Sequence, residues 1–397
     1  MHKPLCLALL LAATAHALAA DDSTRNSGAD STQQAKPADS EEIQALAALA
    51  DLQQRAAAGD ADAQNNLGLL YKNGEGVAQN YDKAREWYEK AAAQGDADAQ
   101  NNLGVLYAKG LDLPKNYGKA REWWEKAAAQ GNAQAQYHLG LIYADGDGVP
   151  QDYAQAAAWF EKAATQGLAE AQYNLGISYT QGKGLPQDTT KAAAWFEKAA
   201  TQGIVQAQQN LGAFYAKGEG VPLDTTKAHQ WFEKAAAQGL AEAQYSLGLS
   251  YIRGQDYSKA REWLEKATAQ DYAGAQFDLG VLYYKGQGVP RDFSKAREWF
   301  EKAAIQGDIQ AQFSLGALYY NGEGVPKDIN KAREWLEKAA AQGYAKAQYN
   351  LGNFYSDGRG VPQDFAKARE WYEKAATQTD DKEIQQAAQK ALQKIPQ

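Results

Sequence analysis

The dipeptide Leu-Gly recurs along this chain at a nearly constant period, and this repetition limits the possible folds more than any other feature. Its leucines are Leu67, Leu103, Leu139, Leu175, Leu211, Leu247, Leu279, Leu315 and Leu351. The spacing is 36 residues at every step except the one from Leu247 to Leu279, which is 32. A single core rarely grows beyond about 250–300 residues. A tandem array of short units is therefore expected for these 397 residues.

Each copy has the pattern of two amphipathic helices. Around Leu-Gly runs the longer string A-x-A-Q-x-x-L-G-x-x-Y, followed by a G-x-G-V-P segment and by K-A-x-x-W-x-x-K-A-A-x-Q-G. In the first copy, Ala63, Leu67 and Tyr71 are spaced by four, and so are Ala84 and Tyr88. This spacing places apolar side chains on one helix face. One helix pair cannot bury that face alone, so the pairs are expected to stack into a solenoid.

The residues between the expected helices favour the same boundaries. An aspartate stands where the second helix should begin and can accept hydrogen bonds from its free backbone N–H groups: Asp152, Asp188, Asp224, Asp256, Asp292, Asp328 and Asp364. A glycine stands just after the expected end of the second helix, where a left-handed residue is favoured: Gly95, Gly131, Gly167, Gly203, Gly239, Gly307 and Gly343. The glycines and proline of G-x-G-V-P predict a tight turn between the two helices.

Two further repeat positions carry packing predictions. The glycine of Leu-Gly has no side chain, so a neighbouring helix is expected to approach it closely. Nine of the ten tryptophans occupy a single position in the second helix, and this regularity predicts that their rings belong to the core: Trp87, Trp123, Trp159, Trp195, Trp231, Trp263, Trp299, Trp335 and Trp371.

These strings resemble the Sel-one-like repeat, a relative of the tetratricopeptide repeat, over residues 60–379. The resemblance implies an all-α fold, a right-handed α/α superhelical solenoid, and adaptor roles in assembling envelope complexes or contacting host cells. Residues 41–59 and 380–397 are expected to form terminal cap helices. The copy at residues 240–271 lacks G-x-G-V-P, so a tighter loop and a local change of curvature are expected there, although a neutral deletion is an equal alternative.

The first residues have the layout of a secretory signal peptide. Lys3 precedes an apolar stretch, and Ala17-Leu18-Ala19 fits a small-x-small cleavage site. We expect residues 1–19 to be removed near Ala19, leaving a periplasmic or secreted protein; a retained anchor is the alternative. Residues 20–40 are polar and lack aromatic side chains, so they are predicted to be a disordered linker. No second apolar stretch of membrane-spanning length follows.

Composition argues against several kinds of chemistry. The net charge is −8, from 41 Lys and Arg against 49 Asp and Glu, whereas nucleic-acid binding needs a basic surface. After cleavage the chain would hold no cysteine and two histidines, His138 and His229, in different copies. Asp145-Gly-Asp147 resembles a fragment of a calcium loop but lies in the ordinary turn position. The sequence therefore predicts no metal, no cofactor and no enzyme activity.

The first helices carry the residues most suited to binding a partner. Aromatic residues recur two positions before Leu-Gly or at the end of the first helix, away from the expected core stripe: Tyr137, Tyr173, Tyr245, Phe277, Tyr284, Phe313, Tyr320 and Tyr349. Exposed rings anchor peptides and helices in grooves. The alternative is that they pack against the next first helix. Residues 60–131 instead carry asparagines there (Asn65, Asn66, Asn101 and Asn102), so binding is expected from residue 132 onward.

These observations predict an exported scaffold that binds a protein or peptide partner on the concave face of its solenoid. A secreted factor that contacts a host is one alternative. Another is a protein that binds or hydrolyses cell-wall material or β-lactams. A cysteine-rich branch of the family is linked to β-lactams, but its disulfide framework has no counterpart in the repeats of this chain.

Overall fold

A computed structural model describes residues 40–112, 114–378 and 381–396, with side chains from residue 43 onward. The expected signal peptide and residues 20–39 of the expected linker lie outside this range. The chain divides into two compact units, Met1–Ile204 and Val205–Gln397, which are described separately below. No helix among the described residues is long and apolar enough to cross a membrane.

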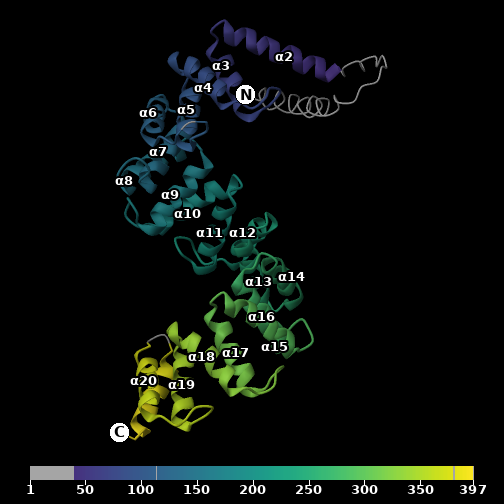
Figure 1. The fold of residues 1–397 in the computed structure, drawn as a ribbon, viewed down its shortest axis with the longest axis vertical. Coiled ribbons are helices and arrows are strands. Elements are labelled where there is room, and N and C mark those ends of the chain that lie inside the picture. Colours follow the sequence, from purple (N-terminus) through teal and green to yellow (C-terminus); the bar gives the residue numbers. More distant parts are fainter. Residues whose placement is uncertain (1–39, 113, 379–380, 397) are drawn as a thin grey trace, which may run out of the picture. The chain divides into compact units, whose positions relative to one another are not determined.

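The described residues form helices joined by short loops (Figure 1), and the predicted all-α solenoid of helix pairs is confirmed. The first unit contains α2 (Ser40–Ala57), α3 (Ala61–Asn73), α4 (Tyr81–Ala93), α5 (Ala97–Lys109), α6 (Tyr117–Ala129), α7 (Ala133–Asp145), α8 (Tyr153–Thr165), α9 (Ala169–Gln181) and α10 (Thr189–Thr201). The second contains α11 (Val205–Lys217), α12 (Thr225–Ala237), α13 (Ala241–Arg253), α14 (Tyr257–Thr268), α15 (Ala273–Lys285), α16 (Phe293–Ile305), α17 (Ile309–Asn321), α18 (Ile329–Ala341), α19 (Ala345–Asp357), α20 (Phe365–Thr377) and α21 (Lys382–Lys394).

The predicted helix boundaries follow from hydrogen bonds at each end. In α10, the Asp188 side chain accepts a hydrogen bond from the backbone N–H of Lys191 at 2.9 Å. At its other end Gly203 has φ +96 and donates its backbone N–H to the carbonyl of Ala200. The same two devices recur in most of the repeats. The aspartate caps and the left-handed glycines are therefore confirmed.

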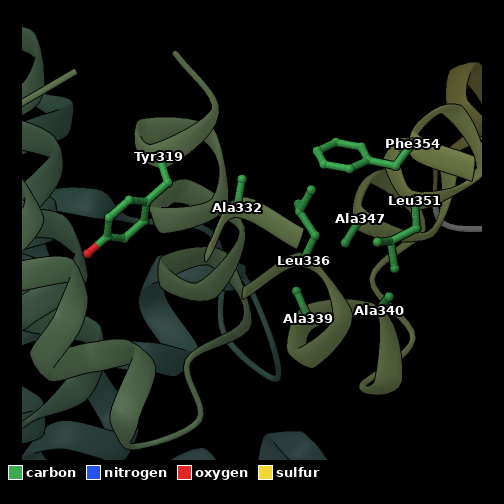
Figure 2. Packing of buried hydrophobic residues seen from close by; sticks show 8 residues of the cluster. All are labelled: Tyr319, Ala332, Leu336, Ala339, Ala340, Ala347, Leu351 and Phe354. Atoms are coloured by element: carbon green, nitrogen blue, oxygen red, sulfur yellow. The ribbon is translucent and has the colours of Figure 1, made fainter. Parts of the chain in front are cut away.

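The core consists of small side chains from one helix interlocked with larger ones from its neighbours. In the second unit, Tyr319 of α17 and Phe354 of α19 lie on either side of Leu336 of α18 (Figure 2). The cluster is completed by Ala332, Ala339, Ala340, Ala347 and Leu351. Because alanines occupy so many of these positions, the helix backbones can pack closely.

The glycine of Leu-Gly permits the closest of these approaches. A Cβ atom built on Gly176 would lie 2.6 Å from the Phe196 ring of the paired helix, and one on Gly280 would lie 2.6 Å from Phe300. The glycine of every Leu-Gly has a ring or a leucine in the same position. The predicted close approach at this glycine is confirmed, and its partner is one defined side chain of the second helix.

The prediction that the recurrent tryptophans lie inside the core is wrong. They lie at its edge, and the next residue along the second helix occupies the core position. The fully packed side chain is the next one along the second helix, such as Tyr88, Phe160 or Leu336, and these residues are 0–7% exposed throughout the repeats. The tryptophans are only half-buried. Each has the ammonium of the lysine three residues later over its ring, 3.6–4.2 Å from the centroid. Their outer faces are thus covered by lysine stems in a cation–π contact, which stabilises a ring at the edge of the core.

A buried glutamine ladder joins successive repeats. The glutamine of A-x-A-Q is 1–6% exposed in every repeat. In α17, the side-chain amide of Gln312 donates to the carbonyl of Ala304 in α16, and its oxygen accepts from Gln342 at the end of α18. Equivalent glutamine pairs lie 2.7–3.0 Å apart along both units. Buried amides that are paired in this way fix the register between neighbouring helix pairs.

The short copy at residues 240–271 has the tight loop that its sequence predicts. Only residues 254–256 separate α13 from α14, whereas seven residues, 74–80, separate α3 from α4. Gly254 continues the helix with φ −77, and Gln255 takes the positive φ of 60 instead. The capping aspartate is retained as Asp256, whose side chain accepts from the N–H of Lys259.

Candidate partner-binding face

Successive first helices lie beside one another on one side of each unit. In the first unit, α5 contacts α7 directly, and the Asn102 side chain on α5 donates to the side-chain oxygen of Asn65 on α3 at 2.9 Å. In the second, Gln209 on α11 donates to the hydroxyl of Ser246 on α13 at 3.0 Å. We call this side the first-helix face. It consists of the first-helix side chains one and two positions before Leu-Gly, one position after it, and at the helix end.

The eight predicted binding residues all lie on this face and are all half-buried. Each ring packs against a second ring with centroids 5.0–5.9 Å apart. Tyr137, Tyr173, Phe277, Tyr284 and Tyr349 contact a ring of their own second helix. Tyr245 and Phe313 contact the ring that precedes the next first helix, and Tyr320 contacts a ring of the following repeat. The rings therefore have one packed side and one side that faces outward.

A pocket of about 260 Å³ opens on this face between α17 and α19. Phe313 and Tyr320, both predicted binding residues, line it together with the core side chains of Leu336 and Phe354. Its polar lining comes from Asn321, Asn350, Asn353 and Arg359. The Arg359 guanidinium donates to the Tyr320 hydroxyl and pairs with Asp357. An apolar floor with a few fixed polar groups is typical of a site that receives one side chain of a partner.

The next pocket along the second unit involves another predicted residue. Tyr349 lines a pocket of about 390 Å³ between α19, α20 and the terminal helix α21. Lys390 and Lys394 of α21 stand at this pocket. The Tyr372 hydroxyl, which also lines it, donates to the side-chain oxygen of Asn353 at 2.6 Å. Burial raises the pKa of Tyr372 to about 12, so it remains a hydrogen-bond donor at neutral pH.

In the first unit a comparable pocket lies between α7 and α9. Its volume is about 390 Å³, and it is lined by Leu141 and Ile177, the residues that follow Leu-Gly. Phe160 contributes from the core, and Asn174 and Lys183 add polar groups. The polar residues of these pockets, asparagines above all, were missed by sequence reasoning. The signal for Asn174 and Asn350 is the position just before Leu-Gly, which is asparagine in five of the nine copies.

The two titratable side chains at the position just before Leu-Gly have shifted pKa values. Burial raises the pKa of the Asp278 carboxyl to about 6, although the hydrogen bond from the Tyr245 hydroxyl partly opposes the shift. Burial lowers the pKa of His138 to about 4, and its imidazole stacks on Trp124 with centroids 4.9 Å apart. At neutral pH the face therefore presents an uncharged His138.

The described residues contain no group of three His, Cys, Asp or Glu side chains that could hold a metal ion. Asp145 is the last residue of α7, and the N–H of Asp147 donates to the carbonyl of Ile142. These two aspartates thus belong to the turn that ends the first helix. His229 bonds through Nδ1 to the hydroxyl of Ser250 at 2.9 Å, far along the chain from His138.

Comparison with known proteins agrees with this architecture. The family model described as the Sel1 repeat matches nine consecutive segments: residues 61–96, 97–132, 133–168, 169–204, 205–240, 241–272, 273–308, 309–344 and 345–380. No curated protein sequence matches the chain.

Two solved structures are similar over most of the chain. One is c5321, described as a protective antigen of uropathogenic Escherichia coli strains with an SLR fold; it is 33% identical, with a TM-score of 0.64, over 90% of this chain and 84% of that one. The other is a Sel1 repeat protein from Oxalobacter formigenes, 33% identical with a TM-score of 0.56 over 84% of this chain and 99% of that one. With nine matched repeats and these neighbours, the chain belongs to the Sel1 repeat family.

Proposed function

We propose that this chain is an exported, non-catalytic scaffold that binds a partner protein through its first-helix face. Sel1 repeat proteins generally mediate protein–protein interactions, and the repeats fill most of the chain. The observation that carries the choice of face is the pocket between α17 and α19. There, two half-buried rings and two core side chains form an apolar floor, and asparagines and Arg359 form the polar lining. Such a pocket suits an apolar anchor residue of a partner.

Filling this pocket tests the proposal. Ala317 lines the pocket on α17 and is half-buried. We expect Ala317→Trp to weaken partner capture at least tenfold, because the indole would occupy the anchor site. Capture is measured with a photo-crosslinking residue at position 321, which is exposed and lines the same pocket. The melting temperature should change little, since the new ring extends into an open pocket.

The matched control is a crosslinker at position 334, an exposed residue on α18. Its products define the background of nonspecific capture. Equal capture at positions 321 and 334, or capture that Ala317→Trp leaves intact, would exclude the first-helix face as the binding surface.

Export is proposed from the N-terminal sequence alone. Lys3, the apolar stretch after it and Ala17-Leu18-Ala19 have the signal-peptide layout. The mature chain should begin just after Ala19, and mass spectrometry of the intact protein from the producing cell measures this. A chain that retains Met1 in a soluble fraction inside the cell contradicts export.

The similarity to c5321 supports a second candidate, a surface or secreted factor that contacts a host. That protein is described as a protective antigen, and it is 33% identical over 90% of this chain. The location of the mature chain decides between the candidates: retention in the periplasm favours an envelope scaffold, and release from the cell favours host contact.

A further inference from the structure

In the regular repeats, the loop between the two helices covers part of the preceding repeat. Its second glycine lies directly on the first residue of the preceding second helix. A Cβ on Gly288, which has φ +70, would lie 2.7 Å from Tyr257 at the start of α14; one on Gly324 would lie 2.6 Å from Phe293 at the start of α16. Only a glycine-containing turn fits this closely, so the N-terminus of the second helix is a docking position for a loop at α6, α8, α14, α16 and α18.

The residue between the two glycines completes this docking with a polar contact. Gln287 donates to the Tyr257 hydroxyl at 2.9 Å, and the Tyr117 hydroxyl bonds to Asp147. The Tyr284 hydroxyl at the end of α15 donates to Glu323 at 3.1 Å. The docking position therefore has two parts, the first residue of the second helix and the last turn of the first helix.

One docking position in the second unit has no loop. The short copy lacks four of the loop residues, and residues 254–256 alone connect α13 to α14. A cleft of about 640 Å³ lies at this place, within the size range of ligand sites. Ala216 and Thr225, which occupy the repeat positions of Tyr284 and Tyr257, both line it. The cleft is thus the docking position of the missing loop.

The lining indicates what the cleft can bind. Its apolar part is formed by Ala216, Ala228 and Phe232. Its polar part is rich in donors: the hydroxyls of Thr225 and Thr226, the His229–Ser250 pair and the Arg253 guanidinium line it, as does Asp256. Asp256 is paired with Lys259 at 3.5 Å, whereas Arg253 forms no ion pair with any described residue. An occupant with a carboxylate beside small apolar residues matches this arrangement.

We propose that the cleft binds a turn of the partner protein in which an acidic residue lies between glycines or other small residues and an apolar residue follows. The turn takes the place of the loop that the short copy lacks. This inference rests on the proposed protein-binding function and assigns the partner a second, chemically defined contact. The best available model of the ligand is a regular loop of the chain itself, residues 217–224, KGEGVPLD.

The experiment measures binding of that octapeptide, labelled with a fluorophore, to the full chain by fluorescence anisotropy. The key variant restores the missing loop by replacing Gly254-Gln255 with GEGVPL, the sequence of residues 218–223. We expect saturable binding to the unmodified chain and an at least tenfold loss in the restored variant, whose melting temperature should be equal or higher. Arg253→Glu and a peptide carrying Glu219→Lys should each weaken binding about tenfold. Lys115→Glu, at an exposed loop residue of the first unit outside the cleft and outside the first-helix pockets, is the matched control and should not.

Absence of peptide binding at millimolar concentration, or equal binding to the restored variant, overturns the inference. A photo-crosslinking residue at position 226 separates this failure from failure of the proposed function. Silence at position 226 with specific capture at position 321 would exclude the cleft and leave the first-helix face intact. Silence at both positions would exclude both.

Discussion

Gly176→Ala is expected to lower the free energy of unfolding by about 1–3 kcal/mol, the usual cost of overpacking a core. A change from glycine to alanine in a helix interior ordinarily stabilises the helix by about 1 kcal/mol. The effect expected here has the opposite sign. The added methyl group would lie 2.6 Å from the ring of Phe196, which is fully buried. Neither α9 nor α10 can absorb this without shifting the contact between them. Urea unfolding of the full chain, followed by far-UV circular dichroism, measures the change.

Two variants serve as controls for this prediction. Gly118 is exposed near the start of α6, where a new Cβ would meet only the Asn116 side chain at 3.3 Å. Gly118→Ala should therefore be neutral or slightly stabilising. Combining Gly176→Ala with Phe196→Leu should recover part of the loss relative to the sum of the single changes, because leucine already opposes glycine in two other repeats. Equal effects of the two glycine substitutions would contradict the close-packing account.

Gln312→Ala is expected to destabilise the chain by about 2–4 kcal/mol, combining a cavity with two lost hydrogen bonds. Gln312 is 5% exposed. Its side chain donates to the carbonyl of Ala304 at 3.1 Å and accepts from Gln342 at 2.9 Å, which joins three successive helices. Because solenoid stability depends on nearest-neighbour contacts, the loss should appear locally. Hydrogen exchange of α16 to α18 should accelerate more than that of α12.

The end of the glutamine ladder supplies the control. Gln348 of α19 donates to the carbonyl of Ala340, but its side-chain oxygen has no hydrogen-bond partner among the described residues. Gln378, which would pair with it, has the extended ψ of 128, and the sequence carries Thr379 where the preceding repeat has Gly343. Gln348→Ala should therefore cost about 1 kcal/mol less than Gln312→Ala, the worth of one hydrogen bond. Equal costs would show that the acceptor bond contributes nothing.

The sequence by itself determined the local architecture of this protein. Helix period, capping aspartates such as Asp188 and terminal glycines such as Gly203 act within one helix or one turn, so their spacing was enough to place both helices of each repeat. Repetition then fixed the solenoid, since every pair must bury its apolar face against an identical neighbour. The close approach at the glycine of Leu-Gly was also predictable, because a residue without a side chain leaves room for a neighbouring helix.

Only the tertiary structure decided which of two adjacent side chains enters the core and where the surface opens. Trp335 and Leu336 are consecutive on one helix, and the rotation of α18 against α17 and α19 buries the leucine and leaves the tryptophan at the edge under Lys338. Both residues fit the periodic apolar pattern, so the pattern cannot determine the rotation of the helix that buries one and not the other. The same holds for the eight predicted rings, whose half-buried state depends on partners in other helices. The cleft beside α12 lies where the short copy lacks four loop residues. The structure of the regular repeats was needed to show which surface those residues would cover.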